Sequence, residues 1–321
     1  WLDSDGDNIN DWDCDFTYFG QSFGLDTPPQ LTFTARNRDN VVTQNYAGTF
    51  NKFSAVSGTF VDNGLPLASG SALSTPATPV MSVTDDVVPG QFIQTVSGYS
   101  EAPYAIRYSK PLQPGAGEIP FDADLDLVFP DDSGNNLTDL DGVCYEVDTN
   151  GDGVTDSCRP FTLSGIGGTR ILYGRLNIDN NFGPEINTLI LPLRSEYWQL
   201  SGGMYGFYVN GADNVAATSP GACTGTTGIT VGLQYYPARK GNLEGNTAPA
   251  LDGLVDGLGR VVFSAPGVGN SGQVNVNLLG PDFMQFDFNG DGVAEAAGAT
   301  ATFGIYGGKN SPVIYKRESY R

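Results

Sequence analysis

The sequence predicts an all-β protein, arranged as two or three β-sandwich modules of the immunoglobulin-like type with calcium-binding loops and a short acidic N-terminal segment. Glycine (43 residues) and proline (20 residues) interrupt the whole 321-residue chain, so turns are expected throughout it. No segment repeats apolar residues at the period of a helix for more than a turn or two. Several runs instead mix polar residues with β-branched and aromatic ones, which favours half-buried strands.

Four runs show this strand pattern most clearly, at residues 30–36, 171–178, 259–264 and 273–279. Successive side chains of a strand point to opposite faces of a sheet, so a period near two buries one face. We therefore expect strands in these runs. The aspartates of residues 122–126 and 139–141 are expected to point outward along strands.

The length allows two or three domains, because domains commonly hold about 100–200 residues. We expect an acidic calcium-binding segment at residues 1–15, a β-sandwich module at 16–165 and one or more modules at 166–321. A further boundary is expected near residue 225.

The net charge of −20 bears on the partners of the protein. A strongly acidic chain repels the phosphates of nucleic acids and the head groups of anionic lipids. No run approaches the roughly 18–20 apolar residues that span a bilayer. We expect no nucleic-acid binding and no membrane insertion.

The chain has four cysteines and no histidine. Without a paired-cysteine zinc motif, structural disulfides are favoured over free buried thiols. Four cysteines allow three pairings. We favour Cys144 with Cys158, because these residues flank a candidate ion loop, and this leaves Cys14 with Cys223. Disulfides indicate an oxidising compartment, which here means a secreted or cell-surface location.

Aspartates recur at the spacing of a calcium loop, with oxygen ligands at positions 1, 3, 5 and 9, a carbonyl at position 7 and glycine at position 6. Ca²⁺ takes six to eight oxygen ligands, and alternating acidic residues on a tight turn supply them. Two segments match closely. The first predicted ligand set is Asp148, Asn150, Asp152, Val154 and Asp156, and the second is Asp287, Asn289, Asp291, Val293 and Glu295.

A third segment near the N-terminus has the same spacing but asparagine at position 6. Its predicted ligands are Asp3, Asp5, Asp7, Ile9 and Asp11, and it resembles the loops of thrombospondin type 3 repeats. None of the three segments has the glutamate at position 12 of an EF-hand, so a helix-pair sensor is excluded. The alternative for all three is a solvated turn rich in Asp, Asn and Gly. If ions bind, we expect a structural role for them.

The absence of histidine removes most hydrolase mechanisms, including Ser-His-Asp and Cys-His arrangements. A glycosidase needs only two carboxylates, but nothing in the sequence selects a pair. We therefore expect that the protein is not an enzyme and has no catalytic or organic cofactor site.

Several blocks resemble the C-terminal region of the MshQ-like proteins, which are associated with mannose-sensitive haemagglutinin pili. The blocks include residues 16–23 (FTYFGQSF), 34–37 (TARN), 173–176 (YGRL), 196–198 (EYW), 286–292 (FDFNGDG) and 301–306 (ATFGIY). The resemblance implies a secreted β-rich module with a pilus or surface role and no catalysis. For Tyr197 and Trp198 core packing is favoured over binding to a sugar; as neighbours on a strand they face opposite ways.

The two ends of the chain differ in charge. Residues 1–35 hold seven aspartates and no basic residue, whereas residues 309–321 hold four basic residues and one acidic residue. Opposed ends favour a head-to-tail homopolymer. We expect a subunit of an extracellular bacterial filament or pilus-like fibre. A monomeric adhesin module that binds carbohydrate or another surface is the alternative, and a glycosidase is a more distant one.

Overall fold

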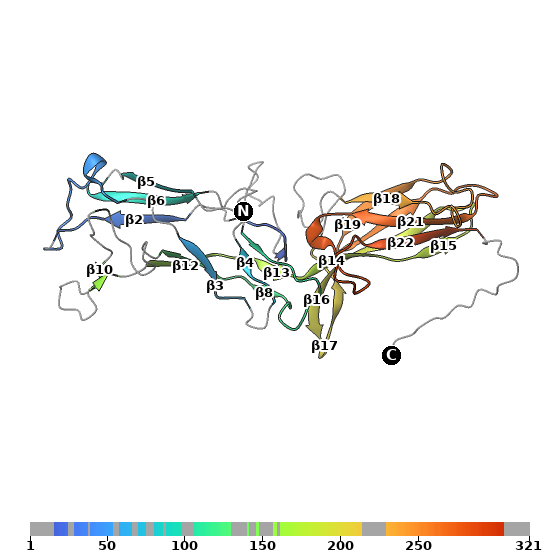
Figure 1. Cartoon of the computed structure of the whole chain (residues 1–321), viewed down its shortest axis with the longest axis horizontal. Helices are drawn as coiled ribbons and strands as arrows, with labels where there is room; N and C mark the ends of the chain where they lie inside the picture. Colours follow the sequence, from blue (N-terminus) through green and yellow to red (C-terminus); the bar gives the residue numbers. More distant parts are fainter. Residues whose placement is uncertain are drawn as a thin grey trace.

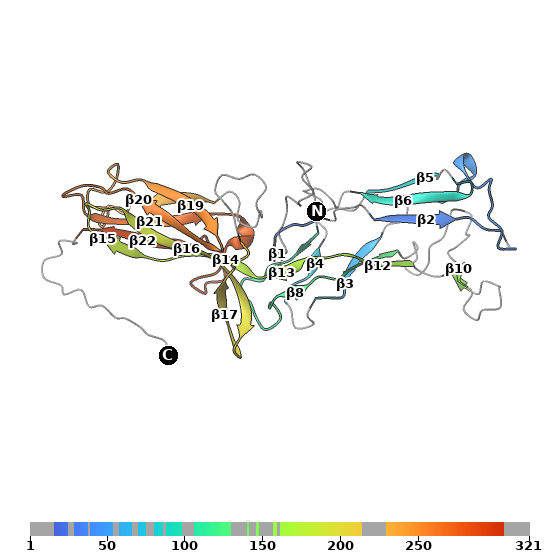
Figure 2. The ribbon, with the colours of Figure 1, turned by 180° about the vertical axis from the view of Figure 1, so that it is seen from behind.

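The computed structural model describes residues 16–24, 29–37, 39–53, 58–65, 70–74, 80–85, 88–97, 106–129, 140, 146–147, 157–158, 161–213 and 229–304. The strands form two lobes that lie end to end (Figures 1 and 2), and β13 is followed directly by β14 where the lobes meet. The helical elements among these residues are short 3-10 turns such as η1 (Gly48–Phe50) and η3 (Asp282–Met284). None is a helix long and apolar enough to cross a membrane. The predicted all-β fold is confirmed.

The C-terminal lobe is a sandwich of two sheets, ordered β14-β16-β20-β19 and β15-β22-β21-β18. If the strands are lettered in chain order, with β14 as A, β15 as A′ and β17 left out, these orders read A-B-E-D and A′-G-F-C. This is the arrangement of an immunoglobulin-like domain. The strands are β14 (Gly174–Ile178), β15 (Asn181–Gly183), β16 (Leu189–Ser201), β18 (Thr230–Gln234), β19 (Pro249–Val255), β20 (Leu258–Phe263), β21 (Gly272–Leu279) and β22 (Gly298–Phe303).

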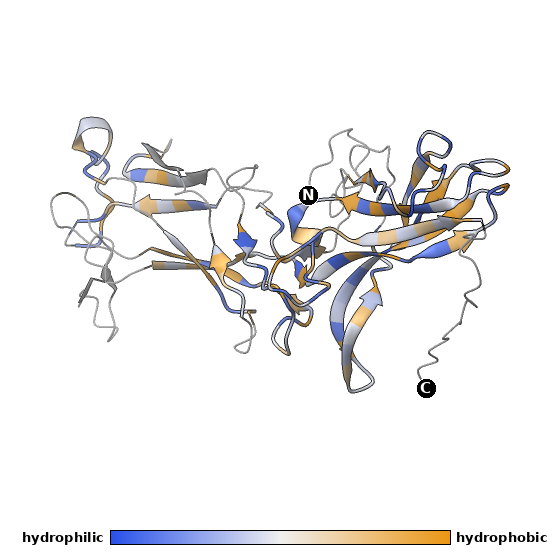
Figure 3. Cartoon of the chain, turned by 45° about the vertical axis from the view of Figure 1, so that its right-hand side comes forward, coloured by the Kyte–Doolittle hydropathy of each residue, from blue (hydrophilic) through white to orange (hydrophobic). Residues whose placement is uncertain are grey.

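Alternating burial along these strands builds the core of the sandwich. In β14 and β21 every second residue is buried, as the period-two pattern predicted. Leu176, Leu191 and Val276 meet in one cluster between the two sheets. Figure 3 shows hydrophobic and hydrophilic residues alternating along the strands. Most of the pairings are antiparallel, whereas β15 runs parallel to β22.

The N-terminal lobe has smaller sheets, ordered β12-β9-β3, β2-β6-β5, β1-β13-β8, β4-β7 and β10-β11. Leu125, Leu127 and Phe129 from β9 are fully buried at the centre of one cluster. Asp122 and Asp124 are exposed as predicted, Asp126 is half-buried, and Asp139 and Asp141 lie outside the described residues. The strands are β1 (Phe16–Tyr18), β2 (Gln30–Thr34), β3 (Thr59–Asp62), β4 (Leu73–Ser74), β5 (Val80–Asp85), β6 (Gln91–Ser97), β7 (Arg107–Tyr108), β8 (Phe121–Asp122), β9 (Leu125–Phe129), β10 (Glu146–Val147), β11 (Ser157–Cys158), β12 (Phe161–Gly167) and β13 (Arg170–Leu172).

A hairpin extends from the C-terminal lobe. The second half of β16 pairs with β17 (Met204–Val209), from Glu196 opposite Val209 to Ser201 opposite Met204. Gly202 and Gly203 form its two-residue turn with φ values of +58° and +81°. Positive φ at both positions is the geometry of a type I′ turn, which glycine adopts without strain. In Figure 1 the hairpin projects beyond the body of the lobe.

The run predicted as one strand at residues 171–178 is divided between the two lobes. Residues 170–172 pair in parallel with β1 of the N-terminal lobe, and residues 174–178 pair with β16 of the C-terminal lobe. Tyr173 lies between these pairings and is completely buried. The two lobes therefore meet without an intervening linker.

Candidate functional site

The loop of residues 287–295 is the predicted calcium loop that lies among the described residues. It connects η3 to β22. Phe286 and Glu295 exchange two backbone hydrogen bonds, with N···O distances of 3.1 and 3.0 Å. The chain therefore doubles back as the ligand spacing predicted, and the first and ninth loop positions lie at the same end of the loop.

Asp287 organises this loop from within and is only 4% exposed. Its carboxylate accepts hydrogen bonds from the backbone N–H groups of Gly290 (2.6 Å), Asp291 (3.1 Å) and Gly292 (3.0 Å). Burial acts to raise the pKa of Asp287, but these N–H groups outweigh it and hold the pKa below its usual value. Asp287 is thus a carboxylate held in its charged form.

The remaining predicted ligands lie at the surface of the loop. Asn289 and Asp291 each accept a backbone N–H from two residues further on, at 2.8 and 2.9 Å. The amide of Asn289 donates to Asp291 Oδ2 at 3.1 Å and to Glu295 Oε2 at 3.5 Å. Val293 supplies one of those N–H groups and exposes its side chain. Hydrogen bonds therefore link the predicted ligand residues within one short loop.

The side-chain amide of Asn289 lies between the carboxylates of Asp291 and Glu295. In the part of the chain that the structure describes, no three acidic, cysteine or histidine side chains form a preassembled metal site. The loop nevertheless offers oxygen ligands from carboxylates, an amide and the backbone, which is the set that Ca²⁺ prefers. The fit is thus one of ligand chemistry and spacing, and calcium binding stays a prediction.

The two other predicted loops, at residues 3–11 and 148–156, lie outside the described residues. The strands that flank the second one are described, and β10 pairs with β11 with Glu146 opposite Cys158. The residues that flank that loop therefore lie next to each other. Cys14, Cys144 and Cys223 lie outside the described residues, so both disulfides stay predictions.

The described loop packs against the joint, which is the contact between the two lobes around Tyr173. Phe286, directly before it, packs in a buried cluster with Phe19 and Tyr108 of the N-terminal lobe. Gln113, also from the N-terminal lobe, donates its side-chain N–H to the Asp287 carbonyl oxygen at 2.6 Å. Anything that stiffens the loop therefore acts on the contact between the two lobes.

Lys110 fastens the joint from the N-terminal side. Its Nζ donates to the carbonyl oxygens of Gly174 (2.8 Å), Phe283 (2.7 Å) and Gln285 (2.7 Å), all in the C-terminal lobe. The ammonium also lies 4.8 Å from the centre of the Tyr173 ring. Burial lowers the pKa of Lys110 to about 7, with nearby Arg175 as a smaller cause. One side chain thus donates hydrogen bonds to three backbone carbonyl oxygens of the other lobe.

Tyr18 crosses the joint within a buried polar cluster. Its side chain packs in the core of the C-terminal sandwich although β1 pairs in the N-terminal lobe. The hydroxyl donates to Asp213 Oδ2 (2.8 Å), accepts from Asn210 Nδ2 (2.7 Å) and lies 2.8 Å from Ser195 Oγ. Ser195 in turn donates to Asp213 at 2.5 Å. Burial raises the pKa of Tyr18 well above its usual value, with the Asp213 charge as the second cause.

Tyr18→Phe is expected to lower the free energy of unfolding by about 1–3 kcal/mol, because Asp213 and Asn210 would each lose a buried partner. Urea denaturation followed by tyrosine and tryptophan fluorescence measures this change. Tyr236→Phe is the matched control, since the exposed Tyr236 hydroxyl bonds only Gln234 among the contacts described. An equal effect of the two substitutions would contradict the structural role of the buried cluster.

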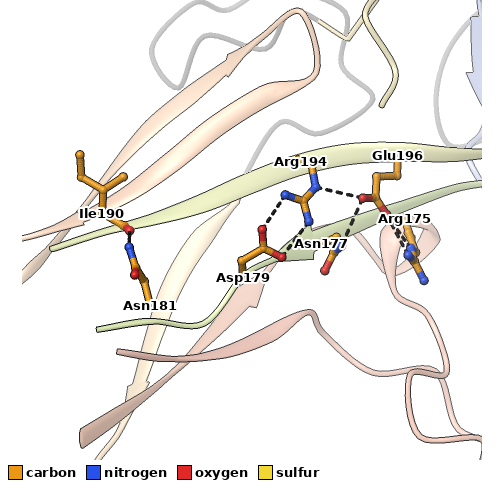
Figure 4. Close-up of polar contacts among 7 residues, drawn as sticks. All are labelled: Arg175, Asn177, Asp179, Asn181, Ile190, Arg194 and Glu196. Carbon is orange, nitrogen blue, oxygen red and sulfur yellow. Dashed lines mark hydrogen bonds and ion pairs between the residues drawn. The ribbon is translucent and has the colours of Figure 1, made fainter. Parts of the chain in front are cut away.

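A ladder of buried and half-buried charges runs along β14 and β16 (Figure 4). Arg194 binds both oxygens of Asp179, at 2.6 and 2.7 Å, and its Nε lies 3.1 Å from Glu196. Glu196 also binds Arg175 at 2.8 Å, and the guanidinium of Arg175 lies 3.6 Å from the ring centre of Phe207. The hydrogen bonds that Arg194 donates to Asp179 raise the pKa of Arg194. The ladder fixes β14 on β16 next to Tyr173.

Sequence reasoning missed the residues that form the joint. Trp198 faces away from its neighbour Tyr197 as expected, and Tyr197 packs on the sandwich core. The indole of Trp198, however, donates to the Gly115 carbonyl oxygen of the N-terminal lobe at 3.0 Å. The hint in the sequence was the lone Lys110 in a proline-containing segment (residues 109–114, SKPLQP), but nothing local identifies its partners.

Comparisons with known proteins agree with this division of the chain. Residues 2–160 match the model for DUF6701, third domain, and residues 172–319 match the model for DUF6701, fourth domain. No curated protein matches the chain. A crystal structure of a tandem from titin aligns with 78% of this chain and 93% of that one, at 8% identity and a TM-score of 0.18, which is too low to define a common arrangement. The chain belongs to the DUF6701 family and contains its third and fourth domains.

Proposed function

We propose that the protein is a structural subunit of an extracellular bacterial filament, in which calcium stiffens the β scaffold and copies join head to tail. The observation that carries this proposal is the joint, where β13 passes into β14 through the buried Tyr173 and both lobes pack around it. A unit of two lobes fixed end to end is suited to a stiff, repeating fibre.

The joint differs from an ordinary contact between domains. Relative motion is the usual expectation for two domains unless their interface is large and apolar. Here Phe16 and Tyr18 of β1 are buried in the core of the C-terminal sandwich. The ammonium of Lys110 and the indole of Trp198 reach across in opposite directions. These contacts support two lobes that move as one body.

Calcium would act at this joint through the loop of residues 287–295. Asp287 is already held as a charged carboxylate, and its carbonyl oxygen is tied to Gln113. A cation would take the place of the Asn289 amide as the partner of Asp291 and Glu295, so repulsion between these carboxylates would be neutralised. In this proposal the ion stabilises structure and takes part in no reaction.

Features of the sequence support the extracellular and polymeric parts of the proposal. The resemblance to MshQ-like proteins implies a pilus or surface role. Four cysteines without histidine favour disulfides, and disulfides persist outside the cytoplasm. The acidic N-terminal and basic C-terminal segments favour contact between different ends of successive copies, which builds an open filament unless the contact closes into a ring.

Calcium is expected to raise the free energy of unfolding, by about 2–3 kcal/mol per occupied loop at a concentration a hundredfold above the dissociation constant. Asp291→Asn should remove the share of this gain that belongs to the loop at the joint. Thermal unfolding of the oxidised protein with calcium and with chelator measures the gain. Asp252→Asn, at an exposed residue paired with Arg260, should leave it unchanged. An equal gain in Asp291→Asn and wild-type protein would exclude calcium binding by this loop.

Electron microscopy of concentrated, oxidised protein tests the filament directly. The proposal predicts fibres that lengthen with calcium and shorten after chelation. Fibres whose length does not change when chelator is added would contradict the role of calcium but leave the subunit role intact. Wild-type protein that stays monomeric at every concentration, with and without calcium, would contradict the subunit role itself.

A further inference from the structure

The outer edge of β17 has no partner strand among the described residues. β17 pairs with β16 on one side only, and the pairing is regular along its whole length. Because the hairpin closes with a two-residue turn, Met204 and every second residue after it direct their backbone groups to β16. The hydrogen bond from Asn210 N–H to the Ser195 carbonyl oxygen continues this alternation. The backbone groups of Tyr205, Phe207 and Val209 therefore point to the open side.

This edge lacks the features that normally keep an edge strand from pairing. Natural edge strands are protected by charged residues, proline, bulges or very short length. β17 has the sequence MYGFYV over six residues, with no charge, no proline and no bulge. Met204 is 71% exposed, Tyr205 46% and Val209 39%. An exposed, uncharged edge of this length is suited to accept an added strand.

We propose that β17 is the acceptor edge for residues 311–320 of a second copy of the chain. This inference rests on the head-to-tail assembly proposed above and names its contact. The segment contains Val313, Ile314 and Tyr315, which favour strands, followed by the basic residues Lys316 and Arg317. An added strand would gain backbone hydrogen bonds from β17 and an apolar surface for alternate side chains.

Charge favours the same partner. The whole chain carries a net charge of −20, whereas residues 309–321 hold four basic residues and one acidic residue. Asp256 is exposed in the turn between β19 and β20. The adjacent Gly257 carbonyl oxygen accepts the Ser195 N–H, which places this turn beside the base of the hairpin. The net charge of the chain and the exposed Asp256 therefore favour a basic partner segment over an acidic one beside the hairpin.

The length of chain between β22 and residues 311–320 favours pairing with a second copy over pairing within one molecule. β22 ends at Phe303, and the nearby Gly304 bonds to Gly183 close to the start of β16. The hairpin begins at Glu196, seven residues along β16 from Leu189 and so about 23 Å away. Together with about 10 Å between the sheets, this gives a separation of about 25 Å, or roughly seven to eight fully extended residues. Pairing within one molecule would thus need residues 305–311 as a fully extended linker, whereas pairing with a second copy sets no such limit.

Two substitutions separate the roles of acceptor and donor. Tyr205→Pro removes an N–H from the open edge while sparing the hydrogen bonds to β16, and Ile314→Pro interrupts the donor segment. Sedimentation is expected to show each variant as a monomer and their equimolar mixture as a dimer, since the mixture has one intact edge and one intact segment. Tyr205→Phe and Ile314→Val are the controls and should assemble as wild type does. A mixture that stays monomeric, or a Tyr205→Pro variant that assembles normally, would overturn the proposal.

A peptide of residues 309–321 gives a second measurement that does not depend on filaments. It is expected to bind the full-length Ile314→Pro chain and to bind at least tenfold more weakly once Tyr205→Pro is added, with circular dichroism checking that the fold is retained. Filaments that persist in Tyr205→Pro would place the contact elsewhere and leave the subunit role standing. Peptide binding to β17 without wild-type filaments would support the acceptor edge and contradict the proposed function. If neither peptide binding nor wild-type filaments are observed, both the acceptor edge and the proposed function are contradicted.

Discussion

Lys110→Met is expected to lower the free energy of unfolding by about 3–5 kcal/mol, because a buried donor is removed and its acceptors stay buried. Methionine fills the same space but leaves the carbonyl oxygens of Gly174, Phe283 and Gln285 without this partner. Chemical denaturation measures the loss. Lys240→Met is the control, since the exposed pair of Lys240 with Glu244 should contribute no more than about 0.5 kcal/mol.

The same variant tests the pKa of Lys110. Burial lowers this pKa from 10.5 to about 7 in the folded protein. Between these two pH values the unfolded chain holds a proton that the folded chain has released, so wild-type stability should rise with pH, by at most about 1.4 kcal/mol per unit. The rise should be smaller in Lys110→Met. Equal slopes between pH 7 and 10 would mean that the carbonyl oxygens keep Lys110 charged in the folded protein.

Gly174→Ala is expected to destabilise the joint by about 3 kcal/mol or more, the upper part of the range for overpacking a core. A Cβ atom at Gly174 would lie 2.3 Å from Cδ1 and 2.4 Å from Cε1 of Tyr18, and 3.1 Å from the sulfur of Met284. The Tyr18 ring cannot yield easily, because its hydroxyl is fixed by Asp213 and Asn210.

Limited proteolysis and thermal unfolding would show this effect as a lower melting temperature and earlier cleavage of the chain. Gly211→Ala is the matched control, because a Cβ atom there has no neighbour within 4 Å. If Gly174→Ala has the same melting temperature as Gly211→Ala, the joint tolerates displacement of Tyr18, and the two lobes are less rigidly fixed than the structure implies.

The fold class could be predicted because alternation is a local property of the chain. The run at residues 30–36 forms β2, and the runs at 259–264 and 273–279 form β20 and β21 to within a residue or two. The division of the run at 171–178 into two strands was harder to predict. Its alternation is compatible with one strand, but its two halves pair with β1 and β16, which lie far away in the sequence.

The candidate site was predictable to a similar extent. The spacing of acidic residues, asparagine and glycines predicted a turning loop from Asp287 to Glu295, and its turns contain two glycines with positive φ. Calcium binding by this loop stays a prediction. Its place against the joint was not predictable, because Gln113 contacts Asp287 across 174 positions of the chain. The polar partners of Tyr18 are equally remote, at 177 to 195 positions. Contacts of this kind depend on how finished sheets pack.

The parallel pairing of β15 with β22 has a mechanical consequence. Tension applied along the C-terminal lobe would pull β15 towards the joint and β22 away from it, since Asn181 to Gly183 run alongside Ala301 to Phe303 in the same direction. Such a pair is loaded in shear, so its hydrogen bonds share the force and must break together. An antiparallel hairpin pulled from its open end unzips one bond at a time. The lobe is therefore built to resist stretching along its length.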